Sequence, residues 1–315
     1  MQTVALARNA MATRFELVLH GENLVALRAA GEEALNEIDR IEAQLSLYRP
    51  ASEISRINAR AAREPVRVTP ATFKFLQHAR RLYDETGGAF DPTIAPLVRC
   101  WGFMGGTGRL PAAEQVTEAQ AIVVLNLVEL EENDFTVRFS LEGVSLDAGA
   151  IGKGYALDRA VELLREAGIT SALVHGGTST VYGLGQPPDA EFWNVTVEYP
   201  KIPGVPAKFA ATVSLRDESV SVSAVWGRSF QIDGQVFGHV LDPRTGFPVK
   251  GAVLAAVALP SATETDAIST ALLVAGEPGH DGIAALRPQM RTVVITECAG
   301  DPGFRVTGRG MPNRR

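Results

Sequence analysis

The sequence predicts an α+β protein with mixed, largely antiparallel sheets and flanking helices. Helical and strand patterns are mixed along the chain without strict strand–helix–strand alternation, which favours α+β over a regular α/β arrangement. Residues 193–249 carry strand patterns only, and Asp233-Gly234 between two of these runs is typical of a two-residue hairpin turn. The chain shows no repeat and no linker, so we expect a single domain over residues 1–310 and a disordered tail at 311–315.

The first part of the chain is expected to be mainly helical. Apolar residues from Leu27 to Leu45 recur at helical spacing and define the buried face of a long helix. Ser52 and Thr69-Pro70 are typical of helix starts, because a hydroxyl caps free N–H groups and proline suits the first turn. The expected elements are a strand over 11–20, helices over 23–47, 52–58 and 69–86, a short helix ending near 101–103, and a surface connection over 104–120.

The second part mixes strands with two further helices. Leu157, Val161 and Leu164 give the central helix its apolar face. Ser261 and Glu264 form a capping-box pattern for the second helix, and Gly276 suits its end. The expected strands lie around 121–130, 136–139, 171–175 and 179–184, within 193–249, and at 251–259 and 291–296.

Composition excludes several classes of protein. The 315 residues are 46% hydrophobic and carry a net charge of −6 without a basic run, so we expect no nucleic-acid partner. Apolar stretches such as 251–259 are too short for a transmembrane segment. Cys100 and Cys298 are the two cysteines, which indicates neither a disulfide framework nor a zinc site. The start of the chain lacks signal-peptide features and a lipidation cysteine, so a cytoplasmic location is expected.

The stretch 144–158 is the strongest pointer to chemistry. An apolar strand passes through three glycines directly into a helix, which brings backbone N–H groups and a helix N-terminus to an anion. Lys153 adds a positive charge and Asp147 a carboxylate. The stretch is not a Walker A loop, because Asp147 and Gly154 replace the required Gly and Ser/Thr. It is not a dinucleotide fingerprint either, because position 157 is leucine. A plain strand-to-helix connection is the alternative.

Two later motifs add candidate metal and base residues. Asp266 and Thr270 lie four apart on one helix face, and their oxygens suit Mg²⁺. The alternative is that Asp266 only complements the helix dipole. His239 ends a strand before an Asp-Pro turn; it titrates near neutrality and is a candidate base, or simply a hydrogen-bonded strand residue.

Other positions have equally ordinary alternatives. Asp91 lies in an Asp-Pro loop that also suits a turn. Tyr48 either stacks on a flat ring or packs, and Met11 is most simply a core residue. His175 precedes Gly176-Gly177, where the glycines favour close backbone approach over catalysis.

Taken together, these fragments resemble the ApbE family, the FAD:protein FMN transferases. The most specific pair is Asp147-x-x-x-Ile-x-Lys-Gly-Tyr with a later His239-x-x-Asp-Pro-x-Thr-Gly. The matches extend from residue 11 to about 276. The others are Met11-Ala-Thr-Arg-Phe, Leu45-Ser-Leu-Tyr-Arg-Pro-x-Ser-Glu, Gly87-Gly-Ala-Phe-Asp-Pro-Thr and Thr265-Asp-Ala-Ile-Ser-Thr-Ala.

The resemblance implies an ApbE-like α+β fold that binds FAD as a substrate with Mg²⁺ at its pyrophosphate. It implies transfer of FMN to a Thr or Ser hydroxyl in the flavinylation motif of an acceptor protein, with release of AMP. His239 would activate that hydroxyl. The metal ligands would be the Ala150 carbonyl, Asp266 and Thr270, with Ser269 as a secondary candidate. The FAD contacts would be Met11, Tyr48, Ala89, Phe90, Asp91, Asp147, Lys153 and Val240.

The chain also departs from the family pattern. Gly176-Gly177-Thr178 replaces Gly-Gly-Asp, Ser223-Ala224 replaces Ser-Gly, and Gly238 stands where a second histidine is common. The last two changes lie near the reacting centre, so rate or acceptor choice is expected to differ. Family members are often exported. An FAD pyrophosphatase that gives FMN and AMP, with water as the acceptor, is the nearest alternative function, and a non-catalytic flavin carrier is the second.

Overall fold

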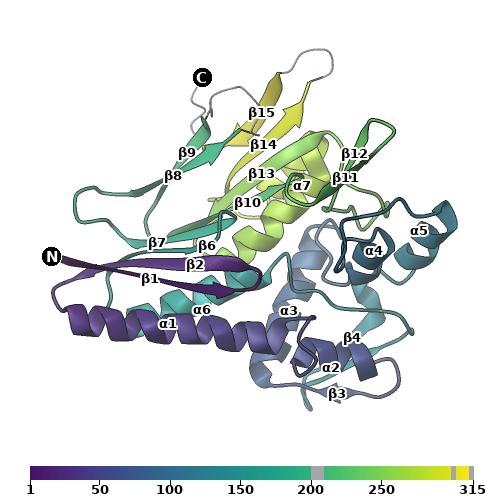
Figure 1. Cartoon of the computed structure of the whole chain (residues 1–315), viewed down its shortest axis with the longest axis horizontal. Helices are drawn as coiled ribbons and strands as arrows, with labels where there is room; N and C mark the ends of the chain where they lie inside the picture. Colours follow the sequence, from purple (N-terminus) through teal and green to yellow (C-terminus); the bar gives the residue numbers. More distant parts are fainter. Residues whose placement is uncertain (200–208, 299–302, 312–315) are drawn as a thin grey trace.

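An eight-stranded antiparallel sheet forms the frame of the molecule in the computed structural model, which describes residues 1–199, 209–298 and 303–311 (Figure 1). Every neighbouring pair in it is antiparallel. β13 is buried along its whole length, because both faces of the sheet are covered. The strand order is β1 (Gln2–Ala10), β2 (Thr13–Gly21), β6 (Ser171–Gly176), β7 (Thr180–Gly185), β10 (Glu218–Ala224), β13 (Ala252–Leu259), β14 (Arg291–Glu297) and β15 (Phe304–Arg309).

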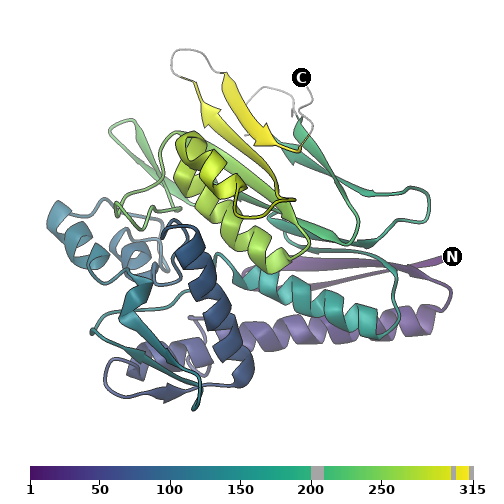
Figure 2. The same cartoon turned by 180° about the vertical axis from the view of Figure 1, so that it is seen from behind.

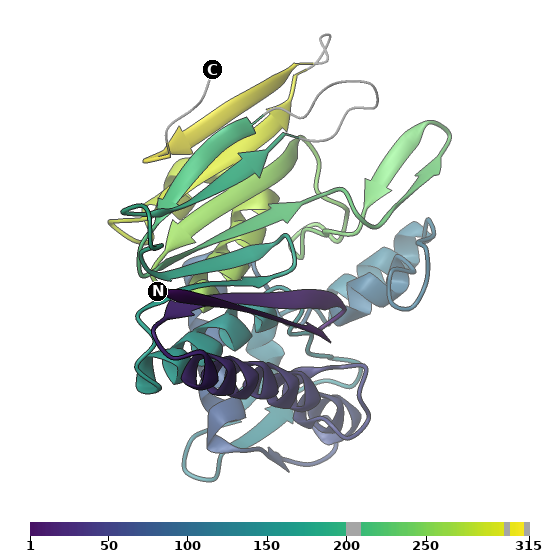
Figure 3. The ribbon, with the colours of Figure 1, turned by 60° about the vertical axis from the view of Figure 1, so that its left-hand side comes forward.

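Three helices cover one face of this sheet. Figure 2 shows α1 (Leu24–Leu45), α6 (Gly152–Glu166) and α7 (Ala262–Ala284) beside one another across it. The hairpin of β8 (Trp193–Glu198) and β9 (Phe209–Leu215) packs its valines, alanines and Leu215 against the other face (Figure 3). No helix in the described ranges is long and apolar enough to cross a membrane.

Smaller elements flank the ends of α6 and α7. The hairpin β11–β12 packs on the helical part through an aromatic cluster of Trp101, Phe103, Phe230 and Phe237. These elements are α2 (Glu53–Arg60), β3 (Val66–Arg67), α3 (Pro70–Glu85), α4 (Ala95–Cys100), α5 (Ala113–Gln120), the 3-10 turn η1 (Leu125–Leu127), β4 (Val128–Glu131), β5 (Thr136–Phe139), β11 (Ser229–Ile232) and β12 (Gln235–Gly238).

The predicted α+β class and most predicted elements are confirmed. Ser52, Thr69 and Ser261 each accept a backbone N–H three residues on, as helix caps do. The Asp233-Gly234 turn also lies where it was expected. Gly276 has φ 62° and breaks the helix there, but the chain turns helical again and α7 continues to Ala284.

Several predictions about local structure were wrong. Met11 and Ala12 are not strand residues: both adopt positive φ (51° and 58°) and form the turn between β1 and β2. Because this turn contains no glycine, the sequence did not indicate it, and the strand that precedes it, β1, was not predicted. The connection 104–120 contains α5, residues 121–127 form turns and η1 rather than a strand, and β15 was not foreseen. Of the expected tail, Met311 is nearly buried and residues 312–315 lie outside the described residues.

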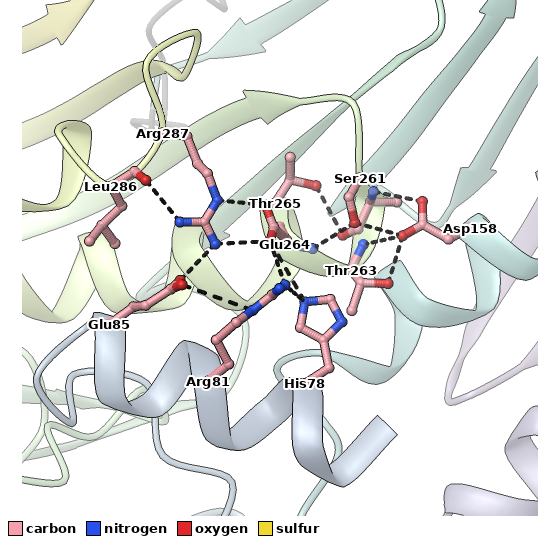
Figure 4. Close-up of polar contacts among 11 residues, drawn as sticks. His78, Arg81, Glu85, Asp158, Ser261, Thr263, Glu264, Thr265, Leu286 and Arg287 are labelled. Carbon is pink, nitrogen blue, oxygen red and sulfur yellow. Dashed lines mark hydrogen bonds and ion pairs between the residues drawn. The ribbon is translucent and has the colours of Figure 1, made fainter. Parts of the chain in front are cut away.

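The N-terminal ends of α6 and α7 are locked together by two carboxylates. Asp158 of α6 accepts the backbone N–H groups of Ala262 (2.7 Å) and Thr263 (2.9 Å) and the hydroxyl of Ser261 (2.8 Å), as Figure 4 shows. In return, Asp266 of α7 accepts the Gly154 N–H at 3.0 Å. Each carboxylate satisfies free N–H groups at the start of the other helix. We call this arrangement the helix-end clamp.

A second ion-pair group holds α7 against α3. Glu264 accepts from Arg81 and Arg287, each at 2.9 Å (Figure 4). The His78 side chain lowers the pKa of Glu264 first, burial opposes this, and the two arginines lower it further, to about 2. Glu264 is therefore ionised at neutral pH and tethers three elements.

The helix-end clamp requires glycine at position 154. A Cβ there would lie 2.0 Å from the Ala262 carbonyl oxygen and 2.8 Å from Asp266 Cβ. We expect Gly154→Ala to lower the free energy of unfolding by about 1–3 kcal/mol, because two backbones must separate. Urea unfolding measures this as a shift in midpoint.

Gly152→Ala is the matched control, since a Cβ at Gly152 meets only Ala148 Cβ at an ordinary 3.6 Å. Equal stabilities of the two variants would contradict the claim that the clamp needs Gly154.

Candidate active site

Asp266 and Lys153 form the centre of the candidate site. Asp266 is 4% exposed, and Lys153 Nζ lies 3.4 Å from its Oδ1. Lys153 also donates to the Gly149 carbonyl at 3.1 Å. The predicted glycine loop thus places one ammonium and one buried carboxylate where two helix N-termini meet.

Two of the three predicted metal donors, Asp266 and Thr270, lie one turn apart on α7, and the third, the Ala150 carbonyl, lies two residues before α6 begins. Ala150 lies just before Ile151, the N-cap of α6, so its carbonyl is outside the hydrogen bonds of the helix, and no described backbone group donates to it. A carboxylate, a hydroxyl at Thr270 and a free carbonyl are hard oxygen donors of the kind Mg²⁺ prefers. Within the described residues no three His, Cys, Asp or Glu side chains cluster, so a metal here would rely on this mixed set. The donors present fit Mg²⁺.

Further hydroxyl groups lie around Asp266, and of these Thr180 and Ser221 were not predicted from the sequence. Ser223 Oγ lies 2.9 Å from Ser269 Oγ and 3.1 Å from Thr270 Oγ1. Deeper in the core, Thr180 Oγ1 donates to Asp266 Oδ1 at 3.5 Å and accepts from Ser221 at 3.1 Å. Serines at every second position of β10 were the available signal, because alternate strand residues share a face.

His239 is held as a neutral base at the edge of this centre. Its Nδ1 lies 3.2 Å from the Arg228 carbonyl, and its ring packs edge-on against Phe103 at 6.4 Å. A carbonyl only accepts, so Nδ1 carries the proton and Nε2 keeps a free lone pair. Burial lowers the pKa of His239 below 6.5; the bond to the Arg228 carbonyl opposes this, and the charges of Arg228 and Lys153 add to it.

Tyr48, Asp147 and Arg228 join the same site. Burial and the nearby Asp147 raise the pKa of the Tyr48 phenol, while Arg228 lowers it. Burial raises the pKa of Asp147, against the Gly149 N–H and the charge of Lys153. Tyr48 is 63% exposed, so its ring is free to stack on a ligand. Arg228 was missed because nothing in its local sequence marks it.

Met11 lies in a strained turn and is partly buried against the core. Its positive φ is unusual for a residue with a side chain. Its N–H donates to Glu42 at 2.9 Å, which fixes the turn against α1. An outlier of this kind is consistent with the predicted contact to FAD, which stays a prediction.

The Ala89–Asp91 segment reaches the site through its backbone. Asp147 donates its N–H to the Pro92 carbonyl at 2.7 Å, so this loop flanks the glycine loop. The Asp91 carboxylate instead accepts from Thr93 Oγ1 (2.6 Å) and N (2.7 Å) and lines a cavity of about 480 Å³ with Arg244. Ala89 and Phe90 are buried, and Val240 packs beside His239 with its carbonyl bound to Val249.

The chain is similar to known proteins over most of its length. The model of the ApbE family matches residues 11–294. An FAD:protein FMN transferase from Treponema pallidum is 33% identical over 263 residues, which is 79% of this chain and 72% of that protein. One from Vibrio cholerae is 30% identical over 278 residues, 85% of this chain and 80% of that protein.

Solved structures agree with this. The crystal structure of the ApbE protein of Thermotoga maritima is similar with a TM-score of 0.84 at 28% identity, covering 94% of each chain. The apo Pseudomonas stutzeri flavinyl transferase ApbE gives a TM-score of 0.84 at 26% identity, covering 98% of this chain and 95% of that one.

Asp91 predicts a pH dependence of stability. Burial raises its pKa from 3.8 to about 6 against the hydrogen bonds from Thr93. Between these values the folded protein binds the proton more tightly than the unfolded chain, so the wild type loses stability as pH rises from about 4 to about 6. Asp91→Asn keeps an acceptor for Thr93 and removes this loss. The difference in unfolding free energy between Asp91→Asn and wild type should therefore increase from about pH 4 to about pH 6, as measured by urea titrations at each pH.

The exposed Asp134→Asn variant is the control. Parallel pH profiles for wild type and Asp91→Asn would contradict the shifted pKa.

Proposed function

The chain belongs to the ApbE family, and on this premise we propose that it cleaves the FAD pyrophosphate with Mg²⁺, transfers FMN to a Ser or Thr hydroxyl of an acceptor protein and releases AMP. The broader activity, an FAD:protein FMN transferase, follows from the family match and from relatives of about 30% identity over most of the chain.

One observation carries the proposal: a cation and a buried carboxylate lie together at the facing ends of α6 and α7, within electrostatic reach of His239. Lys153 contacts Asp266 at 3.4 Å, and its charge lowers the pKa of His239. A phosphoryl transfer is catalysed mainly by positioning and by stabilising charge on the phosphate oxygens. Lys153 supplies that stabilisation from this chain.

Asp266, Thr270 and the Ala150 carbonyl would hold the magnesium ion. When bound, Mg²⁺ neutralises charge on the pyrophosphate oxygens. The position of Lys153 beside Asp266 supports this assignment, because it shows that the carboxylate already attracts a cation. The Ser223 hydroxyl, itself bonded to Ser269, contacts the Thr270 hydroxyl and orients it.

His239 would take the proton from the acceptor hydroxyl. Its lowered pKa keeps the ring neutral at pH 7, and its free Nε2 is the accepting atom. The acceptor oxygen then attacks the FMN phosphorus, the bond to the AMP oxygen breaks, and AMP leaves. A well-placed base contributes roughly 10²–10⁴-fold to such a step.

Replacement of His239 tests the proposal. We expect His239→Ala to lower FMN attachment to acceptor peptides by about 10²–10⁴-fold, because the hydroxyl loses its base. Short synthetic peptides with a central Thr or Ser serve as acceptors; FMN addition is followed by mass spectrometry and AMP by chromatography, with FAD and Mg²⁺ present. His175→Ala is the matched control, since this strand histidine contacts Glu16 and Gly177 instead.

Three results would favour other functions or another base. AMP and free FMN without labelled peptide would identify the pyrophosphatase. Tight FAD binding with no AMP would identify the carrier. Full labelling by His239→Ala would remove the base from the mechanism.

A further inference from the structure

The hairpin β11–β12 carries a free sheet edge beside the proposed base. Its two strands form a separate sheet that no third strand joins within the described residues. In Figures 1 and 3 it projects from the body of the molecule. Phe230 and Phe237 anchor it to Trp101 and Phe103, so the edge is held in a fixed position.

The register shows which backbone groups face outward. His239 donates its N–H to the Arg228 carbonyl at 3.0 Å, and the ladder continues through the pair Phe230–Phe237. In an antiparallel ladder hydrogen-bonded pairs alternate with non-bonded ones, whose N–H and C=O groups point away from the partner strand. On β12 these are Val236 and Gly238, and Val236 is 64% exposed.

The same alternation places His239 for an acceptor. Its own N–H points toward β11, so a residue opposite it on an added antiparallel strand forms a non-bonded pair, with Cα atoms about 4.5 Å apart. Directly opposed side chains lie on the same face. A Ser or Thr at that position therefore presents its hydroxyl to the His239 ring.

We propose that the acceptor protein docks as an extended segment on the outer edge of β12, pairing with the backbone of Val236 and Gly238 and placing its hydroxyl residue opposite His239. This rests on the proposed transferase function. Main-chain pairing at a free edge is a common mode of peptide recognition. We infer that a segment of the acceptor protein occupies this edge, because the hydroxyl that attacks the FMN phosphorus must reach His239, the residue that follows β12.

Two proline variants test the edge. Val236→Pro removes an outward N–H without breaking the ladder to β11, a position where edge strands accept proline. Gln231→Pro is its matched control, because Gln231 is the cross-strand partner of Val236 and faces the opposite edge. We expect Val236→Pro to lower peptide labelling about tenfold or more, through a higher KM for the peptide, while Gln231→Pro labels like wild type. Both should keep wild-type FAD binding and melting temperature.

N-methylated peptides give an independent test on the wild-type chain. In an antiparallel third strand, the residues one and three places after the hydroxyl residue pair with Gly238 and Val236. Methylating either amide nitrogen should lower labelling, and methylating the residue between them should not. This test needs no variant to fold.

Several outcomes would overturn the proposal. Equal labelling by the two proline variants, or an N-methyl scan without the alternation, would exclude pairing at the β12 edge. Loss of self-association in Val236→Pro with unchanged labelling would assign the edge to a second copy of the chain. If wild type releases AMP but labels no peptide, the transferase function itself fails, and this proposal fails with it.

Discussion

The helix-end clamp is the constraint on which the site depends. Two helix N-termini repel one another, and here each is neutralised by a carboxylate of the other helix: Asp158 of α6 caps α7, and Asp266 of α7 caps α6. Gly154 allows the backbones to approach to a distance that no side chain would permit. Asp266 therefore both caps α6 and supplies the buried carboxylate of the candidate metal site.

The site joins two parts of different character. Lys153, Asp266 and Thr270 lie on helices packed against the eight-stranded sheet, with serine hydroxyls of β10 beneath them. His239 instead follows a projecting hairpin that rests on aromatic rings. The rigid part suits the recognition of phosphates, and the hairpin brings the base to the surface where a protein acceptor must arrive. Two of the departures from the family pattern fall within the site. Ser223-Ala224 belongs to the hydroxyl cluster, and Gly238 lies at the end of the hairpin, next to His239.

Local signals in the sequence predicted much of the fold. Helix caps and tight turns depend on residues that are adjacent in the chain. The sequence alone therefore predicted the caps at Ser52, Thr69 and Ser261 and the Asp233-Gly234 turn. The Met11-Ala12 turn could not, because tertiary contact with Glu42 holds residues that have no turn preference. For the site, Lys153 and Asp266 were predicted from the glycine loop and a helix face. The roles of Asp158 and Arg228 were missed, since contacts such as that of Asp158 with Ala262 join residues far apart in the sequence.

The most direct test of the central claim is a crystal structure with FAD and Mn²⁺ in place of Mg²⁺, using anomalous scattering to locate the metal. We expect a peak bound by Asp266, Thr270 and the Ala150 carbonyl, next to the FAD pyrophosphate. A pyrophosphate-bound peak away from these three groups, with Asp266 still in contact with Lys153, would contradict it.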